Sequence, residues 1–245
     1  MSVRTRIGLI VPATNSTAEP DFNMAAPPDV SIHSQRMWNV NELTPEVMEE
    51  MNSDAEQAAR YLAQSKVDLI VYACTTGSFF KGPGYDDELI QCLEKAAGVP
   101  AVATAPAAAE ALRSFGAKRI SVASPYAQWQ NDRLRLYYEA VGFEVLNVEG
   151  DPRGAVAGGQ GHCDLSSESV VEFASGVCRP EADALFCSCT AWRSMEVAAE
   201  LDRRTGKPVV SANQATAWAA FKKLGITKPQ PGFGSLLDRL AGVGV

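Results

Sequence analysis

A repeat of three segments, in the same order in both halves of the chain, most strongly limits what this sequence can fold into. The first segment, Arg6-Ile-Gly-Leu-Ile-Val-Pro12, recurs 113 residues later as Arg119-Ile-Ser-Val-Ala-Ser-Pro125. The second, Asp68-Leu-Ile-Val-Tyr-Ala-Cys-Thr-Thr76, recurs 115 residues later as Asp183-Ala-Leu-Phe-Cys-Ser-Cys-Thr-Ala191. The third pair is Gly98-Val-Pro100 and Gly206-Lys-Pro208. Three ordered matches predict two similar halves of about a hundred residues each, with a functional site between them.

Short β-branched runs alternate with longer helical patterns, which is typical of βαβ units and parallel sheets. Strands are expected near residues 6–11, 30–35, 68–74, 101–104, 119–123, 143–148, 183–189 and 209–212. The best-marked helix is 45–64, with Thr44 as its N-cap and Pro45 in its first position. Further helices are expected at 86–97, 107–115, 128–141, 166–177, 193–205 and 214–224, and a flexible loop at 154–161.

The predicted fold class is therefore α/β. We expect two Rossmann-like lobes related by a pseudo-twofold axis, each with a mainly parallel sheet flanked by helices. Residues 1–115 together with 215–245 are assigned to the first lobe, and residues 116–214 to the second. Because ligands of open α/β sheets bind at the carboxyl ends of the strands, the active site is expected in the cleft between the lobes.

Charge and hydropathy exclude several classes of partner. The chain has 22 Lys and Arg against 29 Asp and Glu, and these basic residues form no cluster, so neither nucleic acid nor an anionic membrane is an expected partner. The apolar run after Arg6 stops at Pro12, which is too short for a signal peptide and indicates a first strand. Six cysteines without an export signal are more typical of reduced thiols, so a cytoplasmic protein is expected.

The two Cys-Thr pairs of the repeat are the strongest candidates for chemistry. Cys74 and Cys189 are predicted at equivalent strand ends, each leading toward a helix whose free backbone N–H groups should lower a thiol pKa and bind a carboxylate. A single cysteine at a buried strand end is usually a small packing residue, but the repeat favours function for this pair. Two thiols on opposite sides of a ligand can transfer a proton at carbon without a cofactor. They can also add reversibly to an activated alkene.

Other catalytic schemes lack their motifs. The chain has no Gly-x-Gly-x-x-Gly after the first strand, no Walker loop, no His-Glu-x-x-His and no Gly-x-Ser-x-Gly. His33 is interpreted as structural, and His162-Cys163 lacks the matching ligand pair of a zinc site. No cofactor and no metal are expected. The remaining cysteines, Cys92, Cys163, Cys178 and Cys187, are interpreted as packing residues.

A family resemblance rests on segments spread from Arg6 to Leu237. These are Ile7-Gly-Leu-Ile-Val-Pro-Ala-Thr-Asn15, Ser34-Gln-Arg-Met37, Tyr72-Ala-Cys-Thr-Thr-Gly-Ser78, Gly82-Pro-Gly84, Ser124-Pro-Tyr126 and Ser188-Cys189. The sequence resembles the maleate cis-trans isomerase and arylmalonate decarboxylase branch of the aspartate/glutamate racemase superfamily. The resemblance implies that Cys74 and Cys189 flank the substrate and that the thiolate of Cys74 adds to a double bond.

The same resemblance implies the residues that bind the substrate. Asn15 and Tyr126 match positions that hold substrate carboxylates, and Thr75, Thr76 and Thr190 offer hydroxyl or backbone N–H donors. From the residues alone, Asn15 can also be explained as a turn or capping residue, and Tyr126 as a packing residue. Decarboxylases of the branch have one catalytic cysteine, in the second half, whereas this chain has two. Where isomerases often have an asparagine, residues 150–159 contain none.

The leading hypothesis is a cofactor-independent, two-cysteine isomerase acting on a small carboxylic acid, with maleate to fumarate as the best single candidate. A racemase for amino acids or related compounds that uses the same two cysteines is the first alternative. An arylmalonate-type decarboxylase is the second, and a non-catalytic protein that binds small acids is the third. The expected partner is a small carboxylate, and a homo-oligomer is expected.

Overall fold

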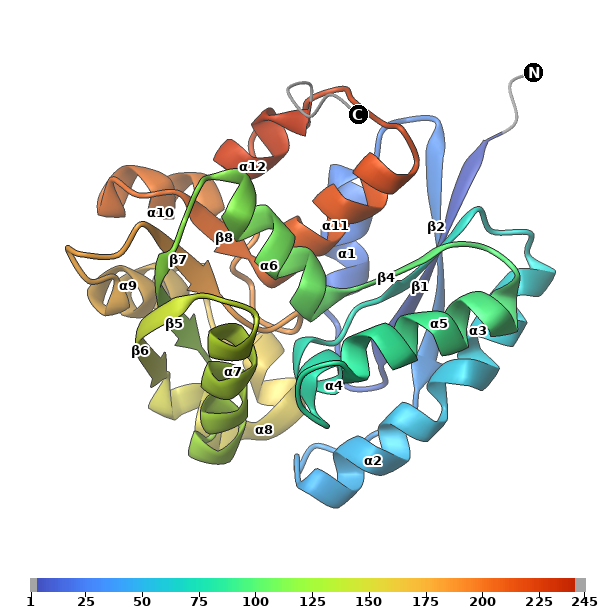
Figure 1. Ribbon diagram of the computed structural model, residues 1–245, viewed down its shortest axis with the longest axis horizontal. Coiled ribbons are helices and arrows are strands. Elements are labelled where there is room, and N and C mark those ends of the chain that lie inside the picture. Colours follow the sequence, from blue (N-terminus) through green and yellow to red (C-terminus); the bar gives the residue numbers. More distant parts are fainter. Residues whose placement is uncertain (1–3, 241–245) are drawn as a thin grey trace.

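Two parallel sheets of four strands, connected in the same order, form the centre of the molecule (Figure 1). The computed structural model describes residues 4–240. The first sheet has the order β2-β1-β3-β4, and the second has the order β6-β5-β7-β8. The strands are β1 (Thr5–Pro12), β2 (Val30–Met37), β3 (Leu69–Tyr72), β4 (Ala101–Ala103), β5 (Arg119–Ser124), β6 (Glu144–Gly150), β7 (Ala184–Cys187) and β8 (Val209–Ser211). The α/β fold and the repeated halves that the sequence predicts are confirmed.

An aspartate fixes the same register in each half. In the first half, the backbone N–H of Arg6 donates to Asp68 Oδ2 at 2.8 Å, and the N–H of Asp68 donates to the Arg6 carbonyl at 2.8 Å. In the second half, Arg119 and Asp183 make the same two bonds, also at 2.8 Å. Because β3 and β7 start at the same level beside their central strands, the Cys-Thr pairs that follow them end at equivalent places.

The long predicted helix 45–64 is two helices. α2 (Pro45–Ser53) starts as expected, because Thr44 accepts a hydrogen bond from the N–H of Val47 at 3.3 Å. The chain then turns at Asp54 before α3 (Ala55–Gln64). The Asp54 carboxylate accepts the backbone N–H of Trp38 at 2.8 Å, so a tertiary contact holds the turn at a point where the helical pattern continues.

The other helices differ more from the prediction. Three agree closely with the expected segments, namely α5 (Tyr85–Ala97), α7 (Gln128–Ala140) and α9 (Ser167–Val177). α10 (Ala198–Thr205) begins five residues later than expected. Three helices had no counterpart in the prediction: α1 (Ala18–Ala25), α4 (Thr75–Phe79) and α8 (Pro152–Asp164). The last helix, α12 (Ser235–Asp238), follows Pro229 and Pro231, where the sequence predicts one. The flexible loop predicted at 154–161 is wrong, because this segment lies in α8, which is kinked where Gly158 has φ 72° and ψ −165°.

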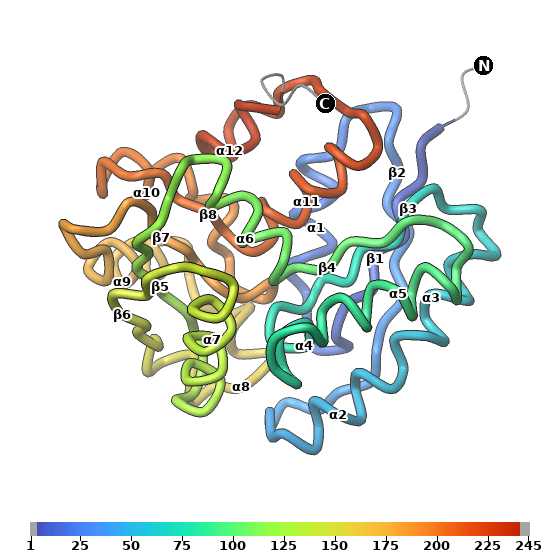
Figure 2. Tube along the Cα trace, viewed as in Figure 1, coloured from blue at the N-terminus to red at the C-terminus, as the bar shows by residue number. Residues whose placement is uncertain are grey.

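Two helices link the halves. α6 (Thr104–Ser114) and α11 (Ala212–Lys223) pack against each other, and both contact β4 of the first sheet and β8 of the second. Figure 2 shows these green and red segments between the two halves. α12 packs against α10 and β8, in the second half. The lobe boundaries given above stay a prediction, and their residues 1–3 and 241–245 lie outside the described part of the chain.

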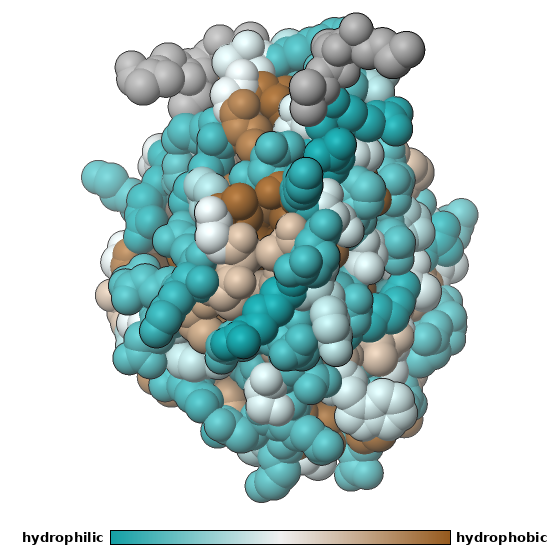
Figure 3. All heavy atoms as spheres, turned by 90° about the vertical axis from the view of Figure 1, so that its right-hand side faces the viewer, coloured by the Kyte–Doolittle hydropathy of each residue, from teal (hydrophilic) through white to brown (hydrophobic). Residues whose placement is uncertain are grey.

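The surface has the ordinary mixture of a globular protein. On the face shown in Figure 3, hydrophilic side chains surround smaller groups of hydrophobic ones. Within residues 4–240, no helix is long and apolar enough to cross a lipid bilayer.

Candidate active site

One pocket, at the carboxyl ends of both sheets, is lined by all seven residues that the sequence singled out. These residues are Asn15, Cys74, Thr75, Thr76, Tyr126, Cys189 and Thr190. The free volume is only about 40 Å³, so the site is narrow. The remaining lining residues are Pro12, Thr14, Asn39, Leu43, Met48, Met51, Gln130, Gly159, His162 and Ala191. Both halves therefore contribute to one site, as the repeat predicts.

Cys74 lies two residues after the end of β3 and is the N-cap of α4. Its Sγ accepts a hydrogen bond from the backbone N–H of Gly77 at 3.4 Å. A side chain at Gly77 would collide with the Tyr72 hydroxyl, which donates to Asn52 Oδ1 at 2.5 Å. Asn52 in turn donates to the carbonyl of Gly77 at 3.1 Å. The hydrogen bonds among Tyr72, Asn52 and Gly77 thus fix the first turn of α4, and with it the position of the Cys74 thiol.

Cys189 has an unusual backbone. Its φ of 125° lies in a region that residues other than glycine rarely adopt, and such a backbone conformation typically costs about 1–3 kcal/mol. The next residue holds this conformation, because Thr190 Oγ1 donates to the Ala73 carbonyl at 3.0 Å and accepts from Asn15 Nδ2 at 3.1 Å. Asn213 Nδ2 donates to the Thr190 carbonyl at 2.8 Å. Contacts across both halves therefore fix the direction of the Cys189 thiol.

Burial reverses the pKa shift that the sequence predicts for the two thiols. The N–H of Gly77 lowers the pKa of Cys74, and the N–H of Ala191, which lies 3.4 Å from Sγ, lowers the pKa of Cys189. Desolvation outweighs both effects, and it raises the pKa of Cys74 to about 11 and that of Cys189 to about 12. The expectation of lowered pKa values is wrong, because it counted the donors and not the loss of water. Both groups are thiols at neutral pH.

Tyr126 joins the two halves of the site. It is buried, and its hydroxyl faces Thr75, Thr76 and Ser188 as well as the thiol of Cys189. Burial raises the pKa of Tyr126 well above its ordinary value, so the phenol remains a hydrogen-bond donor. The hydroxyls of Thr75 and Ser188 are buried and have no partner within residues 4–240. Tyr126 and Thr75 line the pocket, so their hydroxyls are available to bind the oxygen atoms of a carboxylate, whereas Ser188 is not among the lining residues.

Asn15 and Thr190 already have protein partners. Asn15 Oδ1 accepts the backbone N–H groups of Thr17 at 2.9 Å and Ala18 at 3.0 Å, so it orders the start of α1. Its Nδ2 donates to Thr190 and has one further hydrogen for a ligand. The Thr190 hydroxyl both donates and accepts within the protein. The roles of these residues in substrate binding stay predictions, and for Thr190 the geometry favours positioning.

His162 also lines the pocket, a position that no sequence pattern indicated. Its Nδ1 atom lies 3.8 Å from Cys189 Sγ, and the side chain is buried. Burial lowers the pKa of His162 to about 4, so the ring is neutral at pH 7. It lies on α8, which sequence patterns did not predict. In residues 4–240, no group of three or more His, Cys, Asp and Glu side chains is arranged to hold a metal ion.

The loop between β2 and α2 covers the site. Asn41 accepts the N–H groups of Gly159 through its carbonyl at 2.9 Å and of Gln160 through Oδ1 at 2.7 Å. Its Nδ2 donates to the Ala157 carbonyl at 3.1 Å. A second cavity of about 270 Å³ lies beside this contact and shares Leu43, Gln130 and His162 with the pocket. A substrate that passes between these two spaces must displace the Asn41 contacts.

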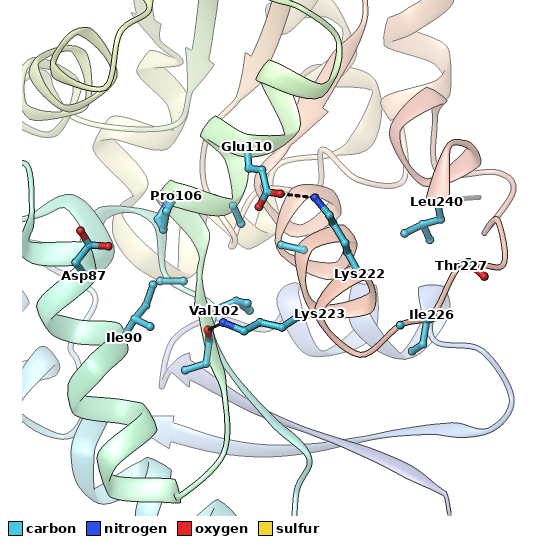
Figure 4. A pocket seen from close by; sticks show the side chains of 15 residues that line it. Asp87, Ile90, Val102, Pro106, Glu110, Lys222, Lys223, Ile226, Thr227 and Leu240 are labelled. Carbon is cyan, nitrogen blue, oxygen red and sulfur yellow. Dashed lines mark hydrogen bonds and ion pairs between the residues drawn. The ribbon is translucent and has the colours of Figure 1, made fainter. Parts of the chain in front are cut away.

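The largest cavity lies elsewhere. It has a volume of about 610 Å³ and lies beside α5, α6 and α11 (Figure 4). Its lining is mostly apolar, and its two lysines already have partners, with Lys222 bound to Glu110 at 2.6 Å and Lys223 to the Ala101 carbonyl at 3.2 Å. No cysteine or histidine is among its lining residues in the described part of the chain. Size alone does not make it the catalytic site.

The raised pKa values predict how the thiols react with iodoacetamide. At pH 7.5 we expect the exposed Cys92 to be alkylated before the buried pair, since only a thiolate attacks the reagent. The rate at Cys74 should rise about tenfold per pH unit up to roughly pH 10, because its pKa is about 11. Peptide mass spectrometry over this pH range measures both rates. A plateau near pH 8 at Cys74 would contradict the burial argument.

A positioning role for Thr190 predicts a specific mutant phenotype. Thr190→Val keeps the shape of the side chain and removes its hydrogen bonds to Asn15 and Ala73, so the free energy of unfolding should fall by about 1–3 kcal/mol. Turnover should fall as Cys189 loses its support, with KM nearly unchanged. Denaturant unfolding and steady-state kinetics measure these effects, and the exposed Thr227→Val serves as control. A raised KM at unchanged stability would instead assign Thr190 to substrate binding.

The chain is similar to known proteins over most of its length. The family model for arylmalonate decarboxylase matches residues 7–237. A maleate isomerase of Pseudomonas putida is 30% identical over 260 residues, which cover 95% of this chain and 97% of that protein. The crystal structure of a variant of the maleate isomerase from Pseudomonas putida S16 with maleate has a TM-score of 0.90 and 25% identity, covering 96% of this chain and 98% of that chain.

A further solved structure contains a trapped covalent species. It is a cysteine-to-serine variant of maleate cis-trans isomerase from Nocardia farcinica, with a covalently bound succinylcysteine intermediate. Its TM-score is 0.88 at 27% identity, and the match covers 96% of this chain and 98% of that chain.

Proposed function

The chain belongs to the arylmalonate decarboxylase family, and from this premise we propose that it is a cofactor-independent cis-trans isomerase that converts maleate to fumarate. One observation carries the proposal. Cys74 and Cys189, which follow equivalent strands of two similar halves, line the same narrow pocket. The two sulfur atoms are close enough for a thiolate at Cys74 to raise the pKa of Cys189.

The reaction divides between the two sulfur atoms. Cys74 is a thiol at neutral pH and first releases its proton to solvent. The resulting thiolate adds to one alkene carbon, and the electron pair of the double bond moves onto the neighbouring carboxylate as an enediolate. Cys189 gives its proton to the other carbon, which leaves a single bond that can rotate. After rotation, the thiolate of Cys189 takes the proton back, the double bond forms again and Cys74 leaves as a thiolate. Every atom of maleate is present in fumarate.

The remaining lining groups stabilise the charge of the enediolate. The hydroxyls of Tyr126 and Thr75 line the pocket together with Cys189, which places neutral donors where one carboxylate gains negative charge. Donors that are oriented before the reaction typically contribute a few kcal/mol each to the barrier. The small free volume excludes water, which would otherwise compete with Cys189 for the proton transfer.

Proton NMR tests the proposed reaction directly. We expect the olefinic signal of maleate to be replaced by that of fumarate when the purified protein is added. D-aspartate and L-aspartate in D₂O test the racemase alternative through deuterium incorporation at Cα, and phenylmalonate tests decarboxylation. Rapid turnover of either alternative substrate with none of maleate would overturn the proposal. Binding of these acids without any turnover would favour a non-catalytic protein.

The cysteines suggest the cellular compartment in which the protein works. All six cysteines are free in the described structure, and both reactive cysteines need to stay reduced, so we place the protein in the cytoplasm. The small carboxylate is the partner in this proposal. The expected homo-oligomer is tested by light scattering on the purified protein.

A further inference from the structure

The pocket proposed to take a dianion has no permanent positive charge. Among its lining residues in the described part of the chain there is no lysine or arginine. The free volume of the pocket is only about 40 Å³, so little water can stay beside a bound ligand to screen two carboxylate charges. His162 is the one lining side chain that can become a cation. The protonation state of His162 therefore affects how strongly the site binds a dicarboxylate.

The surroundings of His162 suit a ring that gains a proton. Cys189 Sγ lies 3.8 Å from Nδ1, and the Tyr126 ring packs edge-on with 6.1 Å between the ring centres. These two titratable groups, on the segments after β7 and β5, are uncharged at neutral pH because burial raises the pKa of each. The carbonyl groups of Gly154 and Pro125 hydrogen-bond to the protonated ring and raise its pKa. No charged side chain contributes to the pKa of His162 within residues 4–240.

We propose that His162 is the specificity-determining residue for dicarboxylates: the neutral ring takes one proton from solvent when the dianion binds, and the resulting imidazolium pairs with the bound carboxylate charge. This inference rests on the proposed function. The proton balance is simple, since imidazole and one solvent proton give imidazolium and no other bond changes. His162 thereby supplies the charge that fixed lysine or arginine side chains do not supply here.

Two opposing effects determine when the ring is protonated. Without ligand, burial keeps the pKa of His162 near 4, and the ring is neutral. One opposite charge within about 4–6 Å raises such a pKa by roughly one to three pH units, so two carboxylates together can bring it above about 8. A monocarboxylate supplies half of this effect. The protonated Nδ1 also faces Cys189, where it can donate to the thiolate that remains after Cys189 protonates carbon.

Calorimetry of ligand binding tests the proton uptake. The Cys74→Ser variant binds maleate without turnover, and its binding enthalpy is measured at pH 7.5 in two buffers of different ionisation enthalpy. We expect uptake of about one proton per maleate, and clearly less for the cis monocarboxylate isocrotonate. With His162→Asn added, which keeps an N–H donor but cannot titrate, the uptake should disappear. Maleate binding with no buffer dependence in Cys74→Ser would overturn the inference.

Two further measurements distinguish an effect of the His162 charge from a purely structural role of its side chain. The affinity of Cys74→Ser for maleate should fall about tenfold per pH unit between the pKa of the free ring, about 4, and the higher pKa of the complex, and it should level off above the latter. His162→Asn should remove this slope. In the enzyme with both cysteines, His162→Asn should raise KM for maleate roughly 10–100-fold at pH 7, below the pKa of the complex. His162→Gln is the second variant, and thermal unfolding verifies that each folds. Unchanged KM and an unchanged slope in a folded variant would overturn the inference.

Failure of the proposed function gives a different result. If neither the wild-type protein nor Cys74→Ser binds maleate or another dicarboxylate, the proposed function fails, and the inference falls with it. If a dicarboxylate binds and is isomerised without proton uptake, only the role of His162 is wrong. The calorimetric signal and the NMR assay together tell these two results apart.

Discussion

Cys74→Ser should lower the turnover of maleate by at least about four orders of magnitude. A serine hydroxyl is far less acidic than a thiol and a much weaker nucleophile toward an alkene carbon, so the first covalent step is lost. Binding should persist, because Cys74 is not needed to hold the carboxylates. The rate of fumarate formation is measured by NMR over hours, and the affinity for maleate by calorimetry.

Cys92→Ser is the matched control for this variant. Cys92 is an exposed thiol on α5 and does not line the pocket, so its replacement should leave turnover at the wild-type value. The same substitution at two positions thus separates a reactive thiol from a general effect of losing one cysteine. If Cys74→Ser retained a tenth or more of wild-type turnover, the thiolate addition step would be refuted.

Cys189→Ser should slow turnover by roughly two to four orders of magnitude and leave maleate attached to Cys74. Cys189 delivers and later removes the proton at carbon, and general acid-base catalysis of this kind typically contributes such a factor. Cys74 can still add to the double bond in this variant. Removal of the proton before elimination becomes the slow step, so the adduct should accumulate.

Intact-mass spectrometry detects this adduct as an increase by the mass of one maleic acid. Peptide mapping should place it on the peptide that contains Cys74. The double variant Cys74→Ser/Cys189→Ser is the control, and it should show no adduct. Full activity of Cys189→Ser would argue against a two-thiol mechanism. Loss of activity in Cys189→Ser alone, with Cys74→Ser fully active, would indicate a single catalytic acid as in the decarboxylases of this branch.

The sequence predicts the positions of the two cysteines well, and the reason is local. Each lies at the end of a short apolar run that starts at Asp68 or Asp183, and the aspartate side chain sets the register of that strand. A strand bounded in this way can end at only one place. The same locality explains the correct start of α2, where Thr44 caps the helix in front of Pro45.

The sequence does not predict α8 or the place of His162. The segment 154–161 is rich in glycine, which is typical of a loop, and its helix is held by contacts with Asn41, more than a hundred residues away in the chain. A pattern of neighbouring residues contains no information about such a contact. The break at Asp54 in the predicted helix 45–64 has the same origin, since the backbone of Trp38 holds it.

By itself, then, the sequence determined the α/β class, the two similar halves and the pairing of Cys74 with Cys189, because these depend on hydrophobic runs and caps that neighbouring residues define. Only the tertiary structure decided the protonation of the site. The pKa values of Cys74, Cys189 and His162 depend on how completely segments from both halves exclude water. Desolvation is a property of the assembled pocket, and no single segment of the chain contains it.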